Sequence, residues 1–356
     1  MAMNTGKKLL EWYVKQARDL PWRNQKDPYA IWVSEVMLQQ TRVQTVIPYF
    51  KNWMRAFPNL HVLANADLDQ VLSVWEGLGY YRRAHNLRRT AKLVVEKYGG
   101  SLPQSTNELI KLPGIGAYTA AAIAAFAYDA DVIALDGNLR RVLSRLFKYE
   151  QDPRTAKAEK TLVQYALEMM PVGEASKFNQ ALMDLGAVIC VPQNPSCDRC
   201  PLSQDCLARQ QGLQHDLPVV PKKKSIPHYQ VSAGILQRGE KTLLARRPEG
   251  DLLGGLWEFP GGTCIEGETL QACLIREWEE ELDLEIQPGK IYGVFSHAYT
   301  HFRVSVHAFK ILSAKGDPKV LEHEEIRWVP LEELMEYPMG KIDREISKVI
   351  LNEQRP

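Results

Sequence analysis

The hydrophobic positions of this chain follow one period in its first part and another in its last part. From residue 1 to about residue 212, apolar side chains recur at helical spacing, as at Leu9, Leu10, Tyr13 and Val14, with only short interruptions. This pattern predicts an all-helical domain over residues 1–212.

Local signals predict two helices of that domain. Asp27 followed by Pro28 is typical of a helix start, and the helix is expected to run through Glu35 to about Gln40. The apolar run 120–127 is far shorter than the roughly 20 residues that cross a membrane, so it predicts a buried helix.

Residues 213–228 interrupt the helical pattern. Three prolines stand between residues 217 and 227 without any hydrophobic period, which indicates a linker. Beyond it, residues 229–236 and 241–247 are typical of strands, and residues 269–282 are typical of a helix. The expected fold class is therefore multidomain, with an all-helical domain followed by an α+β domain over residues 229–356.

Composition limits the class of protein only in part. The chain has 356 residues, of which 45% are hydrophobic, so it is long enough for two domains with sizeable cores. A net charge of +1 neither favours nor excludes nucleic acid, because a DNA footprint can be local. The first 14 residues lack the apolar run of a signal peptide, so we expect a soluble cytoplasmic protein with no membrane partner.

Four cysteines lie within 17 residues: Cys190, Cys197, Cys200 and Cys206. Thiolates this close are expected to converge on one metal ion or cluster, and a reducing cytoplasm disfavours disulfides. Spacing alone fits both zinc and a 4Fe–4S cluster, although zinc sites usually show two close cysteine pairs and here there is one. Cys264 and Cys273 stand apart and are expected to be ordinary buried thiols.

The segment Leu112-Pro-Gly-Ile-Gly116 lies between two helical stretches. Gly114 and Gly116 allow a tight turn with outward-facing N–H groups, and the next helix would direct its positive end the same way. Such a turn can hold one DNA phosphate without reading a base. The alternative is a simple helix–helix loop, which Pro-Gly often marks.

Two acidic residues are candidates for catalysis. Glu35 is expected in mid-helix among apolar residues, where desolvation favours the protonated form that a general acid needs. Asp136 precedes a helix expected over residues 139–147, where Asp is also a common N-cap. The two residues are far apart in the chain, so the sequence pattern alone does not bring them together.

Several motifs match one known family: Trp32-Val-Ser-Glu-Val-Met-Leu-Gln-Gln-Thr-Arg42, Trp75-Glu-Gly-Leu-Gly-Tyr-Tyr81, Leu112-Pro-Gly-Ile-Gly-Ala-Tyr-Thr119, Leu135-Asp-Gly-Asn138, Phe178-Asn-Gln-Ala-Leu-Met-Asp-Leu-Gly186 and the four cysteines. Over nearly its whole length the chain resembles bacterial adenine DNA glycosylases of the MutY type. These base-excision-repair enzymes remove adenine mispaired with 8-oxoguanine in duplex DNA.

The resemblance implies a domain layout and partners. A six-helix barrel module at about 24–134 would be inserted in a cluster domain made of about 1–23 and 135–212. The loop 190–206 would hold a 4Fe–4S cluster, and residues 229–356 would form a Nudix-like domain that recognises 8-oxoguanine. The expected partner is double-stranded DNA with adenine opposite 8-oxoguanine or guanine, bound by a monomer at the bacterial nucleoid.

The resemblance also implies catalytic roles. Glu35 would protonate adenine at N7, and Asp136 would stabilise the oxocarbenium-like sugar, with Asn138 helping to hold the pair. Sugar hydrolases likewise place two carboxyl groups on either side of a glycosidic bond. Tyr118 stands where strand-nicking relatives carry a lysine that forms a Schiff base, so a monofunctional glycosylase is implied.

Two sets of binding residues follow from the resemblance. The adenine must leave the base stack, and its pocket would be lined by Arg18, Leu20, Trp22, Leu38, Val43 and Gln180. A second set would contact the 8-oxoguanine and fill the gap that the flipped adenine leaves in the DNA duplex: Gln40, Thr41, Leu78, Tyr80, His297, Tyr299, Thr300 and His301.

The loop Phe295–His301 departs from the commoner family pattern at two positions. Tyr299 replaces phenylalanine and Thr300 replaces serine, and Thr300 keeps a hydroxyl that can bond the purine edge. Alternatively, His297 and His301 could simply alternate along a strand edge.

A nearly complete Nudix box spans residues 262–284. Such a box holds magnesium around a diphosphate, and Glu277, Glu280 and Glu281 would share one helix face. Asp283 stands where the motif has glycine, which supports a left-handed helix end. The usual state in this family is an acidic face without hydrolase function, and the alternative is magnesium-dependent hydrolysis of nucleoside diphosphates.

Two further alternatives remain open from the sequence. A mismatch-binding protein without catalysis is disfavoured because both acids are present. The basic run Lys222–Lys224 could follow DNA phosphates or serve only as a flexible charged linker.

Overall fold

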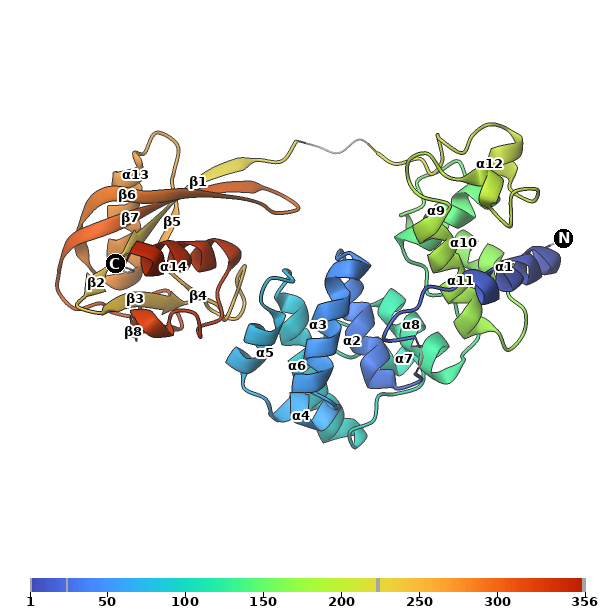
Figure 1. The fold of residues 1–356 in the computed structure, drawn as a ribbon, viewed down its shortest axis with the longest axis horizontal. Helices are drawn as coiled ribbons and strands as arrows, with labels where there is room; N and C mark the ends of the chain where they lie inside the picture. Colours follow the sequence, from blue (N-terminus) through green and yellow to red (C-terminus); the bar gives the residue numbers. More distant parts are fainter. Residues whose placement is uncertain (1, 24, 222–224, 354–356) are drawn as a thin grey trace. The chain divides into compact units, whose positions relative to one another are not determined.

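The computed structural model describes residues 2–23, 25–221 and 225–353. By its internal contacts the chain divides into two compact units, drawn in Figure 1. We call Met1–Ala64 with Arg89–Lys223 the helical unit, and Asn65–Arg88 with Lys224–Pro356 the mixed unit. The basic run Lys222–Lys224, for which DNA contact and a charged linker are the two alternatives, lies outside the described residues.

The helical unit contains no strand among its described residues. Its helices are α1 (Ala2–Gln16), α2 (Pro28–Leu38), α3 (Val43–Ala56), α7 (Thr106–Leu109), α8 (Ala117–Tyr128), α9 (Gly137–Leu146), α10 (Ala156–Met169), α11 (Ala175–Val188), the 3-10 turn η1 (Cys197–Arg199) and α12 (Leu207–Gln210). Helices α4 (Leu60–Asn65) and α6 (Arg82–Tyr98) have residues in both units.

Helix α2 begins where the sequence predicts. Asp27 is its N-cap and accepts a hydrogen bond from the Tyr29 N–H, while Pro28 occupies the first turn. The helix ends at Leu38, two residues before the expected end. The predicted start is confirmed because cap and proline are local signals.

Helices α2 and α8 form the centre of this unit. Every residue from Thr119 to Phe126 of α8 is buried, which confirms the predicted buried helix. Alanines dominate that stretch, and their small side chains let α2 pack closely against it. Helix α11 contacts α1, α8 and α9, so the elements that follow the hairpin are fixed to the same core.

The mixed unit has the α+β architecture expected for the C-terminal part. Its elements are α5 (Leu68–Trp75), β1 (His228–Ile235), β2 (Gln237–Arg238), β3 (Lys241–Arg246), β4 (Trp257–Glu258), β5 (Gly261–Thr263), α13 (Leu270–Leu282), β6 (Glu285–Ala298), β7 (Arg303–Lys315), β8 (Glu325–Pro330), η2 (Leu331–Glu333) and α14 (Lys341–Glu353). Both predicted strands and the predicted helix are confirmed.

Two sheets organise this unit. One has the order β5-β1-β7-β6, with β1 parallel to β7, and the other has the order β2-β3-β4 with β8 also paired to β3. Alternate strand residues point to opposite sides, so Leu243 joins a core with α13 while Leu244 joins a second core with α14. The strands are thereby fixed on both faces by the two helices.

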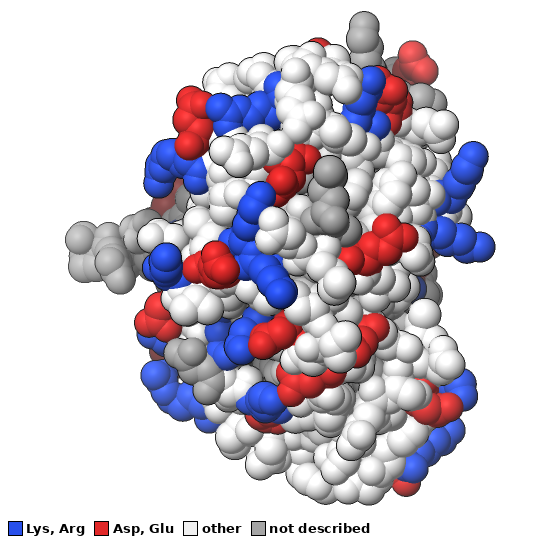
Figure 2. Space-filling model, turned by 90° about the vertical axis from the view of Figure 1, so that its right-hand side faces the viewer, with Lys and Arg blue, Asp and Glu red and all other residues white. Residues whose placement is uncertain are grey.

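Surface properties add little to the assignment of function. On the face drawn in Figure 2, basic and acidic side chains are interspersed rather than gathered in one basic patch. Within the described part of the chain, every helix is too short or too polar to cross a membrane.

Candidate active site

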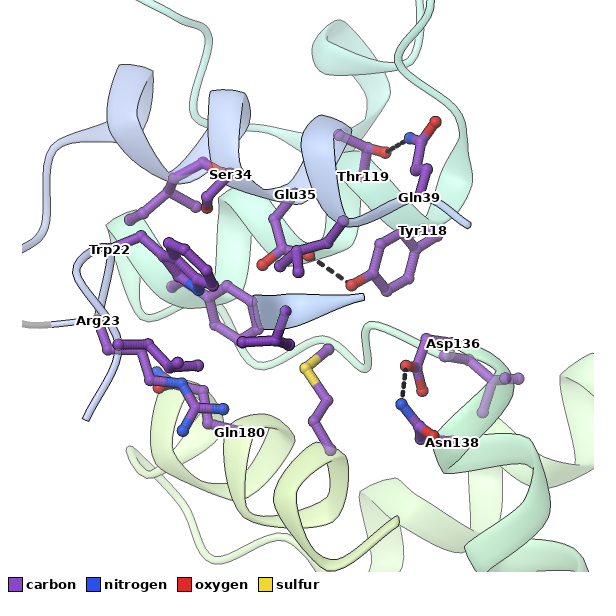
Figure 3. Close-up of a pocket in the computed structure, with 18 of the residues that line it drawn as sticks. Trp22, Arg23, Ser34, Glu35, Gln39, Tyr118, Thr119, Asp136, Asn138 and Gln180 are labelled. Atoms are coloured by element: carbon purple, nitrogen blue, oxygen red, sulfur yellow. Dashed lines mark hydrogen bonds between the residues drawn. The ribbon is translucent and has the colours of Figure 1, made fainter. Parts of the chain in front are cut away.

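The predicted acid Glu35 lies on α2 inside the core of the helical unit. Its side chain is only 5% exposed, because residues Tyr29 to Met37 of this helix are all buried. The Tyr118 hydroxyl donates a hydrogen bond to Glu35 Oε2 at 2.5 Å (Figure 3). Desolvation raises the pKa of Glu35 to about 7, against the opposing effect of the Tyr118 hydrogen bond. Glu35 can therefore carry a proton near neutral pH.

Asp136 is the N-cap of α9, and its side chain lines the same cavity as Glu35. Its Oδ1 accepts a hydrogen bond from the Leu139 N–H at 2.7 Å, which caps α9. Its Oδ2 accepts a hydrogen bond from the Asn138 amide at 2.9 Å, drawn in Figure 3. Burial raises the pKa of Asp136, and both hydrogen bonds oppose that rise. Asp136 is therefore an N-cap of α9, and its second oxygen is held by Asn138.

Arg141 fixes Asn138 from the far side. Its guanidinium donates to Asn138 Oδ1 at 2.8 Å and to the carbonyls of Gly186 and Cys190 at 2.7 Å each. Gly186 must be glycine, since a Cβ there would lie 2.7 Å from the Asn138 side chain. The orientation of Asp136 is therefore determined by α9, α11 and the cysteine loop together.

The hairpin residues Gly114 and Gly116 lie at the N-terminal end of α8. Gly114 has a φ of +75°, a conformation that favours glycine, and Gly116 is the N-cap of α8. The Thr90 hydroxyl donates to the Pro113 carbonyl at 2.7 Å and anchors the turn. The outward side of Gly116 is open, because a Cβ built there would have no atom within 4 Å.

One cavity of about 1230 Å³ brings these groups together. Every predicted catalytic, adenine-pocket and hairpin residue lines it: Arg18, Leu20, Trp22, Glu35, Leu38, Val43, Gly114, Gly116, Tyr118, Asp136, Asn138 and Gln180. Gln40 and Thr41 line it as well. Figure 3 shows Glu35, Tyr118, Asp136 and Gln180 around the opening.

Arg23 is a residue of this cavity that the sequence analysis did not identify. It forms a bidentate pair with Asp184 of α11, at 2.7 Å for each contact, and Arg18 adds a contact at 2.6 Å. Desolvation would raise the pKa of Asp184, but the Arg23 hydrogen bonds and charge outweigh it and hold that pKa below its usual range. Asp184 lies in the motif over residues 178–186, and an acidic residue among the apolar positions of that motif was the available signal for a cationic partner.

The four clustered cysteines surround a small cavity of about 30 Å³, together with Arg145 and Arg209. Arg145 donates a hydrogen bond to Cys190 Sγ at 3.4 Å and further bonds to the carbonyls of Val191 and Pro192. Burial raises the pKa of Cys200 to about 12, so in a protein without a bound metal this thiol stays neutral. The donor set fits a cation-containing cluster, whose charge would favour thiolates.

In the mixed unit, Tyr80 and Thr300 meet. Their hydroxyl groups share a hydrogen bond, and Tyr80 has a left-handed backbone with a φ of 51°. The Tyr299 ring packs against the rings of His297 and Phe302, each at 4.7 Å between centroids. Leu78 is buried.

His297 and His301 are not equivalent positions of one strand edge. His297 lies on β6 and is partly buried, whereas His301 is exposed in the turn before β7. The alternative that both histidines alternate along a strand is therefore wrong.

The three Nudix glutamates have different surroundings on α13. Arg276 pairs with Glu277 at 2.9 Å, with Glu280 at 3.0 Å and with Glu268 at 2.9 Å. Glu281 instead faces the interior, where burial raises its pKa to about 8. Asp283 adopts the left-handed conformation expected of glycine, with a φ of 53°, and ends the helix.

Comparisons with known proteins agree with this architecture. Residues 33–166 match the family described as HhH-GPD superfamily base excision DNA repair protein, and residues 231–349 match the NUDIX domain. The adenine DNA glycosylase of Rattus norvegicus is 32% identical over 401 residues, covering 98% of this chain and 78% of that protein. The adenine DNA glycosylase of Buchnera aphidicola subsp. Baizongia pistaciae is 36% identical over 309 residues, covering 86% of each chain.

A solved structure of a thermostable thymine-DNA glycosylase aligns with 58% of this chain and 95% of its own, with a TM-score of 0.54 at 28% identity. Fold and site together define a base-excision-repair DNA glycosylase that carries a Nudix-like domain. The chain belongs to the adenine DNA glycosylase family. The expected fold class and the expected enzyme class are thereby confirmed.

Proposed function

We propose that this glycosylase releases adenine paired with 8-oxoguanine or guanine in duplex DNA and does not cut the strand. The observation that carries the proposal is the cavity shared by Glu35, which can be protonated near neutral pH, and Asp136. A mismatch-binding protein without catalysis would have no need for a costly buried acid at this place.

The geometry supports an acid-assisted departure of the base. Adenine flipped into the cavity receives the Glu35 proton at N7, so that the base leaves as a neutral molecule. Positive charge then develops on the sugar, and the Asp136 carboxylate, held by the Leu139 N–H and by Asn138, stabilises it. Water adds at the sugar carbon, and the ionised Glu35 accepts its proton.

The absence of strand cleavage follows from Tyr118. A phenol has no amine with which to form a Schiff base, and its hydroxyl is already engaged with Glu35. Burial raises the pKa of Tyr118 well above its usual value, so the side chain is a hydrogen-bond donor rather than a nucleophile. The abasic product should remain intact until alkali is added.

Binding to duplex DNA is supported by the hairpin. The N–H groups at the start of α8 and the positive end of its dipole suit one phosphate, and the space beside Gly116 leaves room for it. In the mixed unit, Tyr80, Tyr299 and Thr300 would meet the base opposite adenine. We expect the enzyme to act as a monomer.

We propose a 4Fe–4S cluster rather than zinc at the four cysteines. Zinc sites usually show two close cysteine pairs, and here only Cys197 and Cys200 form one. The four cysteines line one small cavity, and four thiolates are the usual ligands of a 4Fe–4S cluster. Iron and sulfide quantitation on the purified protein would distinguish the two.

The decisive test is single-turnover cleavage of a labelled duplex with adenine opposite 8-oxoguanine. Strand breaks should appear only after alkali, and Glu35→Gln should abolish them. Breaks without alkali in a nuclease-free preparation would contradict the monofunctional mechanism. Normal activity in Glu35→Gln would contradict the role of the acid.

A second candidate function is supported by Glu281. A cavity of about 370 Å³ lies beside it, lined also by Glu258, Asp343 and Arg247, and Glu281 Oε2 is buried without a hydrogen-bond partner. Magnesium held by Glu277, Glu280 and Glu281 would supply electrophilic assistance to a diphosphate. Magnesium-dependent hydrolysis of nucleoside diphosphates by the full chain, lost in Glu281→Gln but kept in Glu35→Gln, would establish it. No hydrolysis across a nucleotide panel would exclude it.

A further inference from the structure

A pair of charged residues distant in sequence joins two segments of the mixed unit. Arg344 of α14 donates from Nε to Glu76 Oε1 at 2.6 Å and from Nη2 to Glu76 Oε2 at 2.9 Å. The Met339 N–H donates to the same Oε2 at 3.3 Å. We call this bidentate pair the Glu76–Arg344 clamp.

The clamp is largely removed from water and its cation is fully bonded. The Arg344 side chain is 11% exposed and the Glu76 side chain 24%. Arg344 also donates to the carbonyls of Leu334 at 2.9 Å and Tyr337 at 2.5 Å. Because the planar guanidinium is bonded to the carboxylate on one side and to backbone carbonyls on the other, it has one orientation. The carboxylate that it binds is therefore held in place as well.

Further contacts join segment 65–88 to the C-terminal part of the mixed unit. Arg246 pairs with Asp69 of α5 at 2.7 Å, and His85 hydrogen-bonds the Gly254 carbonyl at 2.8 Å. A Cβ at Gly255 would lie 3.1 Å from the His85 ring and 3.2 Å from Leu72, so this loop is closely fitted to the segment. The segment 65–88 is thereby held against the C-terminal residues at several points.

The clamp lies at the base of the turn that carries Tyr80. Glu76 is the C-cap of α5, and the turn that follows is tied internally by Trp75 Nε1 to the Gly79 carbonyl at 3.0 Å. Arg83 donates to the Leu78 carbonyl at 3.2 Å and to the Gly79 carbonyl at 2.9 Å. A turn this constrained moves as one body, so fixing Glu76 also fixes the backbone of Tyr80, and the Arg83 guanidinium lies over the Tyr80 ring at 5.4 Å.

We propose that Glu76 and Arg344 are positioning residues that couple the Tyr80 turn to the loop 297–301. The hydrogen bond between Tyr80 and Thr300 forms only when both are in register, and the clamp sets that register. Discrimination between 8-oxoguanine and guanine opposite adenine then depends on a pair that touches neither base. The inference rests on the proposed preference for the 8-oxoguanine pair.

The test compares affinities of the full chain for two duplexes, adenine opposite 8-oxoguanine and adenine opposite guanine, in the Glu35→Gln background. Glu76→Gln and Arg344→Gln should each lower the affinity ratio about tenfold, as expected when one partner of a desolvated pair is removed. The double variant should lose no more than either single variant, since both break one interaction. Arg344→Lys should also lose the ratio, because an ammonium cannot bind both oxygens.

Glu285→Gln is the matched control. Its pair with Lys315 lies in the same unit at 2.9 Å, but both side chains are more than two-thirds exposed, so the ratio should not change. Thermal unfolding of each variant identifies any loss of fold, and Glu76→Asp, which keeps the charge, should retain part of the ratio.

An unchanged ratio in a folded Glu76→Gln chain would overturn the clamp, as would an equal loss of affinity for both duplexes. Failure of the proposed function gives a different result. In that case the chain with Glu35 would release no adenine, while the affinity ratio would still respond to the clamp variants.

Discussion

The proposed mechanism depends on keeping one carboxyl group uncharged. Glu35 is buried by its neighbours on α2 and α8, and its single described donor is the Tyr118 hydroxyl. That hydrogen bond favours the ionised form, while desolvation, the larger effect, favours the protonated form. Tyr118 therefore adjusts the acid strength of Glu35 in addition to excluding an amine.

The pH dependence of base release should report this balance. With a pKa of about 7, Glu35 is protonated below neutrality, so the single-turnover rate should be level at those pH values where Asp136 is still ionised, and it should fall as pH rises through 7. Tyr118→Phe removes the donor that lowers the pKa, so its alkaline limb should move to higher pH. Tyr128→Phe, a change on the same helix, is the control and should leave the profile in place.

A profile without an alkaline limb near pH 7 would mean that Glu35 is not the acid. A Tyr118→Phe limb at lower pH would mean that the hydroxyl acts in another way. Both outcomes can be read from the same rate measurements.

At the scale of elements, the helices could be predicted where their signals are local. The cap and proline before α2 and the alanine run of α8 are such signals, and both helices are found as expected. Residues 18–23 carry no such signal. Their place in the cavity depends on the ion pairs of Arg18 and Arg23 with Asp184, more than 160 positions away, and Arg23 was missed for that reason.

Asp136 shows how one residue can serve an element and a reaction. Asparagine caps helices about as well as aspartate, so Asp136→Asn should keep the stability of α9 while base release falls about a hundredfold or more. Asp136→Ala should lose activity and also about 1 kcal/mol of stability. Denaturant unfolding and single-turnover rates separate the two effects. Wild-type rates in Asp136→Asn would show that the residue is only a cap.

At the scale of the whole molecule, the sequence motifs predicted a helical and an α+β fold, but they did not predict that segment 65–88 contacts the C-terminal residues. The segment 65–88 contacts the C-terminal residues through pairs such as Glu76 with Arg344, which are 268 positions apart. Their spacing has no period, and each residue alone is typical of a solvated surface charge. Only the folded structure shows that they meet.

The division into two units also predicts how the proposed cluster should affect stability. The cysteine loop is bound to α9 through Arg141 and Arg145, and both α9 and the loop belong to the helical unit. Loss of the cluster in Cys200→Ala should therefore lower the unfolding temperature of that unit and loosen Asp136, whose neighbour Asn138 is held by Arg141. The mixed unit, which contains none of these contacts among its described residues, should unfold at an unchanged temperature.

Calorimetry of the cluster-loaded chain and of Cys200→Ala would test this prediction. A chain with two units is expected to show two transitions, and only the one assigned to the helical unit should move. The assignment can be made with Trp278→Phe, a change in the core of the mixed unit that should move only the other transition. If both transitions move together on loss of the cluster, the two units unfold as one body and the cluster stabilises the whole chain.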